Sequence, residues 1–287
     1  MSRSASLFRR LSMALVFVFL YAPILVLIVF SFNDSSSRSV WAGFTLDWYR
    51  ELLRDDLILD AFYTTLAVSV LAAVIATVAG TFAAIGFYNM KRRWRGPLMT
   101  INNIPMVNAD IVTGVSMCLF FVAAFSLWGQ AAEWINASLG TDLPTKFYLG
   151  FGTMLIAHIT FNIPYVILSI MPKLRQMDKN LVDAAQDLGC TWMQAFWKVV
   201  VPEIKPGIVN GLLIAFTMSV DDFVISYFTA GSTTANLAMR IYAMTKKRIS
   251  PEVNAISTLL FATVLILLIV INLREASQEK AARKLRR

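Results

Sequence analysis

The sequence predicts an all-α membrane protein with six transmembrane helices. Hydrophobic residues make up 57% of the 287 residues and charged residues only 15%, a composition too apolar for a soluble domain. Six apolar runs contain no Lys or Arg and are long enough to cross the bilayer, since about 30 Å of hydrocarbon requires roughly 20 helical residues. The basic residues gather in short segments beside these runs, as expected for a chain oriented in a membrane.

We expect the six runs to belong to a single transmembrane domain that covers residues 1–287. The first run follows three arginines as a signal peptide would, but it is long, contains Pro23 and lacks a small-residue cleavage site, which favours an uncleaved span. Residues 128–148 are expected to form a short amphipathic outer helix and a turn. The predicted spans are residues 11–32, 61–88, 98–126, 149–171, 207–230 and 253–273.

The basic segments predict the orientation of the chain. With six spans, four basic segments fall on one side, which is then cytoplasmic, and both termini lie on that side. Lys246, Lys247 and Arg248 fall on the predicted outer side and are the exception to this bias. The net charge of +8 therefore reflects membrane orientation, and we expect the lipid bilayer, and no nucleic acid, as a partner of these residues. The four cytoplasmic segments are residues 3–10, 91–95, 173–205 and 274–287.

Ionisable residues inside the predicted spans are few, and they identify a candidate pathway. These are Asp110, His158, Asp221 and Asp222. A charged Asp near the bilayer centre costs about 2.5 to 3.5 kcal/mol, so such residues usually face a bundle interior or a water-filled cavity. At about 1.5 Å per residue, Asp110 lies roughly 18 Å and Asp221 roughly 21 Å from the cytoplasmic ends of their spans, so both are expected near mid-membrane.

No predicted span holds a Lys or Arg that could neutralise these aspartates. Their charge is balanced by protonation, by a cation from a second subunit, or by a cationic substrate. The structural alternative for each is an aspartate that stays neutral or caps a broken helix. Three aspartates together favour a cation path, and because consecutive helix positions lie about 100° apart, Asp221 and Asp222 are expected to have different roles.

The fourth span places His158, Asn162 and Tyr165 on one helical face, at positions i, i+4 and i+7. This face is expected to line the same cavity, and the alternative is that its polar groups form hydrogen bonds that hold the bundle together. A zinc site has no support, because no ligand spacing accompanies the single histidine.

The polar segment of residues 172–206 interrupts the apolar spans and is expected to form a cytoplasmic coupling loop. It resembles the loop signature of ABC importer permeases, in which Glu-Ala-Ala precedes a glycine and then Leu-Pro. Asp183 replaces the usual Glu and Val201 the usual Leu. Gly189 is expected to provide a sharp turn between two short helices. The residues matched to the loop signature are Asp183, Ala184, Ala185, Gly189 and Pro202.

The predicted outer segment of residues 33–60 combines aromatic and acidic side chains. Its rings are candidates for docking an extracytoplasmic binding protein, and the alternative is an interfacial aromatic belt. The candidate docking residues are Trp41, Phe44, Trp48 and Tyr49.

Longer segments resemble the spermidine/putrescine ABC importer permeases of the PotC type across nearly the whole chain. This resemblance implies a type I ABC importer permease fold in a bacterial inner membrane. It also implies four kinds of partner or cargo: a homologous second permease subunit, an ATPase subunit dimer, an extracytoplasmic polyamine-binding protein and a polyamine substrate. The segments that carry the resemblance are residues 41–44, 158–161, 216–227, 241–242 and 250–255.

The chain contains no G-x-x-x-x-G-K-[ST] loop to hold a nucleotide. We therefore expect a transport subunit rather than an enzyme, no cofactor in this chain, and ATP-Mg in the partner ATPase. Transport by alternating access would be driven through the coupling loop. The competing hypotheses are an ABC permease for another solute, a secondary cation transporter, which should show repeated broken spans, and a membrane enzyme, for which no nucleophile, metal cluster or acid-base set is present.

Overall fold

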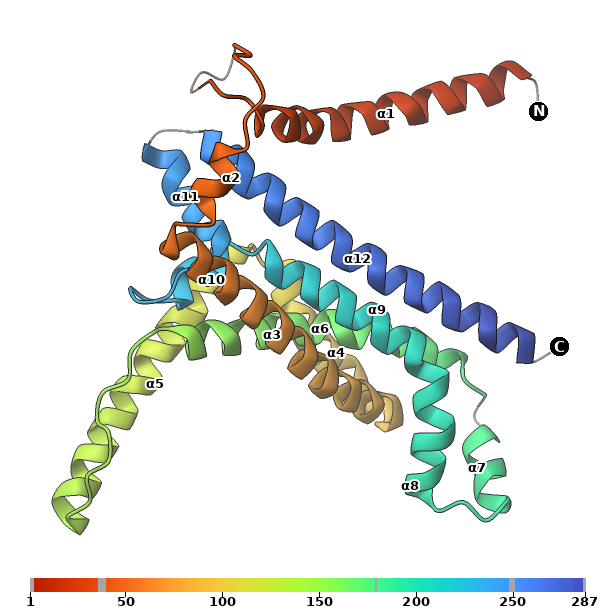
Figure 1. Ribbon diagram of the computed structural model, residues 1–287. Coiled ribbons are helices and arrows are strands. Elements are labelled where there is room, and N and C mark those ends of the chain that lie inside the picture. Colours follow the sequence, from red (N-terminus) through yellow and green to blue (C-terminus); the bar gives the residue numbers. More distant parts are fainter. Residues whose placement is uncertain (1–2, 36–39, 179, 248–250, 286–287) are drawn as a thin grey trace. The chain divides into compact units, whose positions relative to one another are not determined.

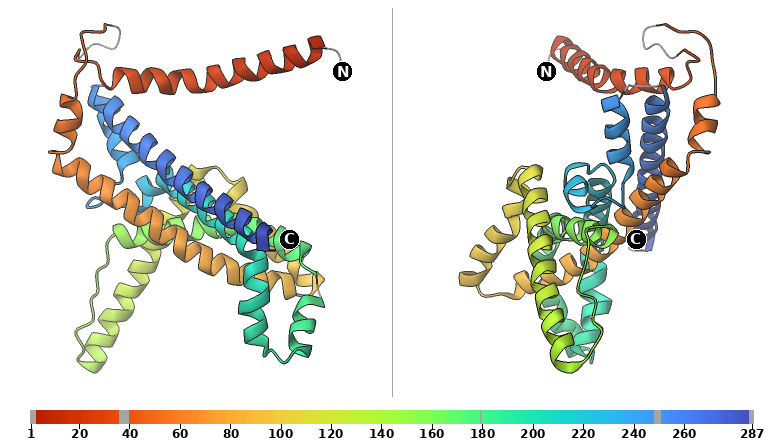
Figure 2. Two further views of the ribbon diagram at one scale, coloured as in Figure 1. Left: turned by 45° about the vertical axis from the view of Figure 1, so that its right-hand side comes forward. Right: turned by 90° about the vertical axis from the view of Figure 1, so that its left-hand side faces the viewer.

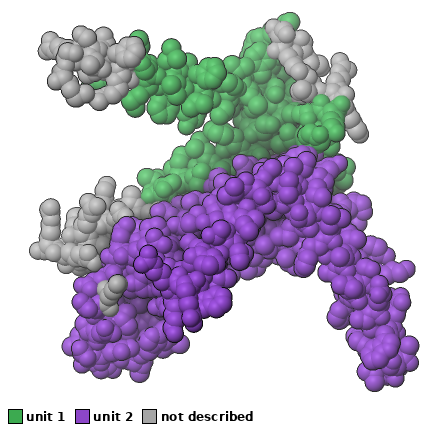
Figure 3. Space-filling model, turned by 180° about the vertical axis from the view of Figure 1, so that it is seen from behind, with its two compact units in different colours: residues 1–60, 240–287 green, residues 61–239 purple. Residues whose placement is uncertain are grey.

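The computed structural model describes residues 3–35, 40–178, 180–247 and 251–285, which fold almost entirely into helices. The chain divides into two compact units (Figure 3). The first comprises Met1–Asp60 and Arg240–Arg287, and the second comprises Ala61–Met239. The candidate pathway and the coupling loop both belong to the second unit, while the outer aromatic segment belongs to the first.

In the first unit, the long helices are the first and last of the chain, and α12 contacts both α1 and α2. The loop between α1 and α2 is organised by Asn33, whose side-chain amide donates to the Val40 carbonyl and whose side-chain oxygen accepts from the Ala42 N–H. This loop carries the outer aromatic residues. The helices are α1 (Arg3–Phe30), α2 (Asp47–Leu52) and α12 (Pro251–Leu285).

The second unit contains α4 to α10 and most of α3, whereas α11 begins in the second unit and continues into the first. A five-residue π-helical turn, Phe196–Val200, joins α8 to α9 without a break in the helix. The helices, labelled in Figure 1, are α3 (Asp56–Asn89), α4 (Arg92–Val107), α5 (Asp110–Leu139), α6 (Phe151–Gln176), α7 (Asn180–Asp187), α8 (Trp192–Ala195), α9 (Val201–Val220), α10 (Val224–Thr229) and α11 (Leu237–Lys247).

Six helical segments of the described chain are long and apolar enough to span a bilayer, in agreement with the predicted number. Two of them differ from the predicted spans. The run predicted at 98–126 is broken at Asn108 and Ala109, so Asp110 begins a helix that continues to Leu139. The run predicted at 207–230 ends at Val220, and α10 is a separate short helix. The depths estimated along unbroken helices therefore do not apply to these aspartates.

The centre of the second unit is the antiparallel packing of α6 against α9, which depends on two small residues. A side chain on Gly207 would meet the backbone of Ile170 at 3.1 Å, and one on Gly211 would meet Val166 at 3.2 Å. Gly207 and Gly211 are separated by three residues, the G-x-x-x-G spacing that lets helix backbones approach closely in membranes. The polar residues of α6 are thereby held against the end of α9.

α5 extends beyond its contacts with other helices and is accompanied by the chain that follows it (Figures 1 and 2). Gly140, in the left-handed region with φ +65°, ends the helix. The Asn136 side chain then donates to the Leu143 carbonyl and accepts from the Leu143 N–H, and the Trp128 indole N–H donates to the Pro144 carbonyl. The segment expected to be a separate outer helix is thus the end of α5 followed by an irregular segment that returns along it.

Candidate functional site

The break between α9 and α10 is formed around Asp221 and Asp222. A break at membrane depth exposes backbone groups that must find partners within the protein. The Asp222 carboxylate is the partner of two such groups. It accepts hydrogen bonds from the Ile225 N–H at 3.2 Å and from the Ser226 N–H at 2.8 Å. Asp222 is therefore fixed at the start of α10, where it serves the capping role considered as the structural alternative.

Asp222 is also part of a buried polar network that joins α6, α10 and the segment before α11. The Ser226 hydroxyl donates to the Asp222 carboxylate at 2.9 Å, and the Asn236 amide donates to Ser226 and to the Asp222 carbonyl, each at 2.8 Å. The His158 Nε2 lies 2.9 Å from the Ser226 hydroxyl and 3.4 Å from the Asp222 carboxylate. Because the single hydroxyl hydrogen of Ser226 is given to Asp222, Nε2 of His158 must carry the hydrogen that it donates.

Asp221 differs from Asp222 in its exposure and in its contacts. Its side chain is exposed, and it has no ion-pair partner in the part of the chain that the structure describes. It sits at the C-cap of α9. Of the two adjacent carboxylates, Asp222 is therefore used by the fold and Asp221 is available to a ligand.

Asp110 lies at the same end of the α5–α10 pair as Asp221. Gly114 packs against Val224 and Phe228, while Phe125, farther along α5, lines a surface hollow with Gly231, which follows α10. The two helices therefore run in the same direction, and their first residues lie at one end. Asp110 is exposed in the first turn of α5.

The remaining two residues of the predicted α6 face have different surroundings. The Asn162 amide donates to the Ser219 hydroxyl at 2.7 Å, and its side-chain oxygen is fully buried without a partner. Tyr165 packs against Phe161, with 5.4 Å between the ring centroids, and lies within range of an electrostatic interaction with Asp110. His158 and Asn162 thus hold α6 to α9 and α10, whereas Tyr165 lies within electrostatic range of one exposed carboxylate, that of Asp110.

Sequence reasoning missed three partners of this site: Ser219, Ser226 and Asn236. Ser226 follows Asp222 by four residues, a spacing that could have suggested the contact. Asn236 lies in a loop after α10, and Ser219 contacts a residue 57 positions away. No local signal identifies these last two.

The predicted coupling loop contains a helical hairpin. We call it the coupling hairpin and define it as residues 180–195. α7 ends in a turn in which the Gly189 N–H donates to the Gln186 carbonyl and the Cys190 N–H donates to the Ala185 carbonyl. This is the Schellman pattern, which places a residue in the left-handed region after the helix. Gly189 has φ +86°, so the predicted sharp turn is present. Figures 1 and 2 show the short helix α7 beside the α8 end of the helix that continues into α9.

The coupling hairpin presents apolar side chains to the outside. Leu188 at the turn is 87% exposed and Trp192 is 59% exposed. Among the residues of the loop signature, Ala185 is buried within the hairpin, while the others are exposed: Asp183, Ala184, Gly189 and Pro202. Asp183 lies in the first turn of α7, where a carboxylate interacts favourably with the helix dipole.

The four aromatic residues predicted to dock a binding protein divide into two pairs. The Trp48 indole N–H donates to the Asn33 carbonyl at 2.9 Å, and the Tyr49 hydroxyl lies 2.7 Å from the Ser31 hydroxyl. These two rings are half-buried. Trp41 and Phe44 are 50% and 68% exposed. Trp48 and Tyr49 therefore hold the loop in place, and Trp41 and Phe44 form its exposed surface.

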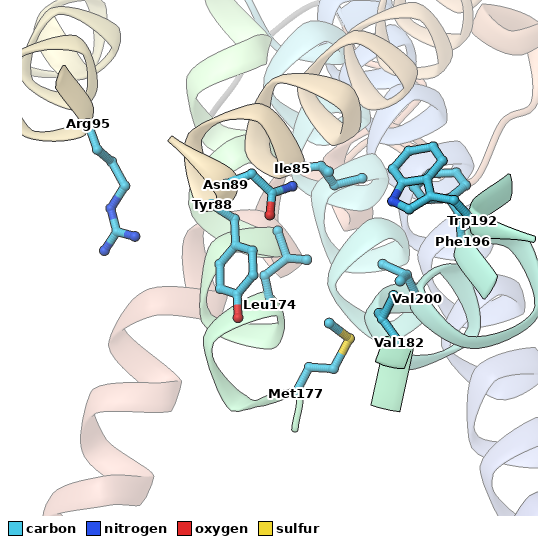
Figure 4. A pocket seen from close by; sticks show the side chains of 10 residues that line it. All are labelled: Ile85, Tyr88, Asn89, Arg95, Leu174, Met177, Val182, Trp192, Phe196 and Val200. Carbon is cyan, nitrogen blue, oxygen red and sulfur yellow. The ribbon is translucent and has the colours of Figure 1, made fainter. Parts of the chain in front are cut away.

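A cavity of about 490 Å³ lies beside the coupling hairpin, where α3 and α6 end (Figure 4). We call it the α4–α8 cavity. Tyr88 and Asn89 come from the last turn of α3, Arg95 from the first turn of α4, and the opposite wall from α8 and the π-helical turn. The lining residues are Ile85, Tyr88, Asn89, Arg95, Leu174, Met177, Val182, Trp192, Phe196 and Val200.

Comparison with known families and proteins gives consistent matches over most of the chain. The family model described as "Binding-protein-dependent transport system inner membrane component" matches residues 76–287. The putrescine transport system permease protein PotI of Escherichia coli (strain K12) is 36% identical over 249 residues, covering 86% of this chain and 83% of that protein. The spermidine/putrescine transport system permease protein PotC of Haemophilus influenzae is 32% identical over 263 residues, covering 91% and 94%.

Solved structures share the fold at lower identity. A chain of a bacterial ABC transporter involved in the import of the acidic polysaccharide alginate superposes with a TM-score of 0.70 at 16% identity and covers 96% of both chains. A chain of the MetNI methionine ABC transporter gives a TM-score of 0.56 at 19% identity and covers 83% of this chain and 98% of that one. The arrangement of helices is therefore that of ABC importer membrane subunits.

Proposed function

The chain belongs to the family of inner membrane components of binding-protein-dependent transport systems, and we propose that its substrate is a polyamine such as putrescine or spermidine. Its six apolar helices make it a multi-pass inner membrane protein, and it is a transport subunit rather than an enzyme. The relatives named for putrescine and spermidine transport, which match more than four-fifths of the chain, support the proposed substrate.

The observation that carries the proposal is the pair of exposed carboxylates, Asp110 and Asp221, at one end of the α5–α10 pair. A polyamine is a chain of protonated amines, and each ammonium group is an N–H donor that suits a carboxylate acceptor. Tyr165, near Asp110, adds an aromatic ring, whose face attracts cations. The apolar runs around them, residues 98–126 and 207–230, hold no Lys or Arg, and neither carboxylate forms an ion pair within the described residues, so a cationic substrate would balance their charge.

In this proposal Asp222, His158 and Asn162 support the pathway instead of binding substrate. The Asp222 carboxylate and the His158 Nε2 are engaged with Ser226. They fix the start of α10, and thereby the position of Asp221, which immediately precedes Asp222. The roles assigned to the two adjacent aspartates are therefore binding for Asp221 and positioning for Asp222.

The proposed partners are a homologous second permease, a pair of ATPase subunits and an extracytoplasmic polyamine-binding protein. The exposed apolar residue Leu188 at the turn of the coupling hairpin suits a cleft on the ATPase, which would bind and hydrolyse ATP-Mg. The exposed rings Trp41 and Phe44 suit docking of the binding protein. ATP-driven movement of the hairpin would open the pathway outward for the cation, and hydrolysis would return it inward.

The test is uptake of labelled putrescine and spermidine by the assembled transporter in proteoliposomes. Asp221→Asn removes one charge with little change of shape, so we expect at least a tenfold loss of uptake, about 1.4 kcal/mol, with assembly and ATP binding retained. Asp110→Asn is expected to act in the same direction. The matched control is Asp34→Asn, which neutralises an exposed aspartate outside the spans and should transport normally.

Uptake of both polyamines at the wild-type rate and affinity by Asp110→Asn and Asp221→Asn would refute the cation pathway. The permease would then serve a different solute. Competition assays with anionic and neutral solutes on the same proteoliposomes would identify its class.

A further inference from the structure

The α4–α8 cavity lies outside the substrate pathway and combines apolar walls with one cationic edge. Figure 4 shows Arg95 on the side of Tyr88 and Asn89, with Trp192, Phe196 and Val200 on the opposite side. We propose that this cavity binds one anionic phospholipid of the cytoplasmic leaflet, whose phosphate pairs with Arg95 and whose acyl chain lies against the apolar wall. The inference depends on the membrane location of the chain and not on the proposed substrate.

The position of the cavity along the helices favours a lipid over a soluble ligand. Its lining comes from the last turns of two membrane-spanning helices, at Tyr88 and Asn89 of α3 and Leu174 of α6. The ends of spanning helices lie at the membrane surface, where headgroups and the first part of the acyl chains are found. A volume of about 490 Å³ is in the range of small-molecule sites, roughly 300 to 1,000 Å³, which suits part of a lipid rather than a protein.

The charge of α4 selects an anionic headgroup. Lys91, Arg92, Arg93 and Arg95 occur within five residues, and no Asp or Glu occurs between Asp60 and Asp110. Within the described chain, Arg95 forms no ion pair with a carboxylate. A guanidinium binds a phosphate by paired charge-assisted hydrogen bonds, and basic residues beside a membrane are attracted to anionic lipids.

The neighbouring residues support an interfacial location for this helix. The Arg93 guanidinium lies 5.9 Å from the centre of the Trp94 ring, and Trp94 is exposed. Tryptophan is enriched at membrane interfaces, where its amphipathic ring sits at the level of the headgroups. The first turn of α4 thus has both residue types that contact the lipid surface.

A lipid in this cavity would connect α4 to the coupling hairpin. Val182 of α7 and Trp192 of α8 belong to the wall opposite Arg95. The hairpin is the part expected to move with the ATPase, so an occupant that contacts both walls would alter that movement. Anionic lipid would then regulate coupling without contacting the substrate.

The first experiment titrates the full-length purified chain with phosphatidylglycerol and counts bound lipids by native mass spectrometry. Loss of one charge-assisted contact corresponds to about a tenfold loss of affinity, which we expect for Arg95→Gln. The matched control is Arg92→Gln, which removes the same charge from an exposed residue of α4 that does not line the cavity; it should stay within about twofold of wild type. Phosphatidylcholine should bind wild type and Arg95→Gln equally weakly.

Equal phosphatidylglycerol binding by wild type and Arg95→Gln would overturn the proposal. Competition by millimolar inorganic phosphate would also overturn it, because the site would then recognise a soluble anion. Neither result bears on polyamine uptake, so failure of this inference is distinguishable from failure of the proposed function.

The second experiment takes its main readout from the wild-type chain. Phosphatidylglycerol with a photoactivatable acyl chain is bound to the wild-type chain in nanodiscs, and the labelled peptides are identified. We expect labelling of Trp192 and Phe196, and its loss in Val182→Trp, which fills the cavity. Labelling confined to α1 or α5, or unchanged in Val182→Trp, would show that the acyl chain lies elsewhere and would contradict the proposal.

Discussion

The break between α9 and α10 and the coupling hairpin are both interruptions of membrane helices, but they are stabilised in opposite ways. At the break, Asp222, Ser226 and Asn236 bond to one another in the interior. In the hairpin, a backbone turn at Gly189 is sufficient, and Leu188 and Trp192 project outward. The polar groups at the break find their hydrogen-bond partners within the chain, whereas the hairpin has an apolar surface that only a partner protein would cover. Substitutions at the break should therefore act on stability, and those in the hairpin on assembly and coupling.

The largest effect is expected for Asp222→Ala. It leaves the N–H groups of Ile225 and Ser226 without their acceptor, and each unsatisfied buried group costs about 1 to 3 kcal/mol. We expect a loss of about 3 kcal/mol in the free energy of unfolding, measured in detergent micelles. Asp221→Ala is the control, since its carboxylate is exposed, and it should unfold like wild type. Equal destabilisation by both variants would show that the network does not stabilise the break.

The loop that carries Trp41 and Trp48 also combines a ring bonded within the chain with a ring exposed for a partner. Trp41→Ala should weaken docking of the binding protein by about 2 kcal/mol, roughly 30-fold in affinity, if the exposed ring becomes a central interface residue. Trp48→Ala should instead lower stability, because its indole is bonded to the Asn33 carbonyl. Surface plasmon resonance with the assembled transporter measures the first effect and thermal unfolding the second. Unchanged docking by Trp41→Ala would favour an aromatic membrane belt.

Gly189→Val tests whether the hairpin transmits force. Its φ of +86° is unfavourable for residues with a side chain by about 1 to 2 kcal/mol, and a β-branched residue would distort the turn. We expect the chain to insert, and uptake to be lost while ATP hydrolysis continues. The control is Gly86→Val, at an exposed helical position where an added Cβ meets no atom within 4 Å. Normal uptake by Gly189→Val would mean that the turn is not needed for coupling.

The smallest effect is expected for Leu188→Ala. The side chain is 87% exposed, so the free energy of unfolding should not change. If Leu188 enters a cleft on the ATPase, partial loss of its buried surface should weaken association by about 1 kcal/mol, roughly fivefold. Leu139→Ala, at a leucine of α5 that is 72% exposed, is the control in the same pull-down. Equal weakening by both would indicate a nonspecific effect of surface leucines.

The amino-acid order alone was enough to predict the number of membrane helices, because a span of about 20 apolar residues is a local property of the chain. The same holds for the turn at Gly189, since a short helix followed by glycine carries its own signal. The candidate aspartates were also identifiable, as ionisable residues are rare inside apolar runs.

Only the tertiary structure decided where the helices break and which aspartate is available. The segments at 108–109 and 221–223 lie inside long apolar runs, which were therefore predicted to be continuous helices. A break at Asp221 requires acceptors and donors from elsewhere, and the donors include Asn236, 14 residues after Asp222. Such a partner is selected by packing across helices and not by sequence spacing. For the same reason, Asp221 and Asp222 are alike in the sequence but differ in the fold, where one is exposed and the other is bonded.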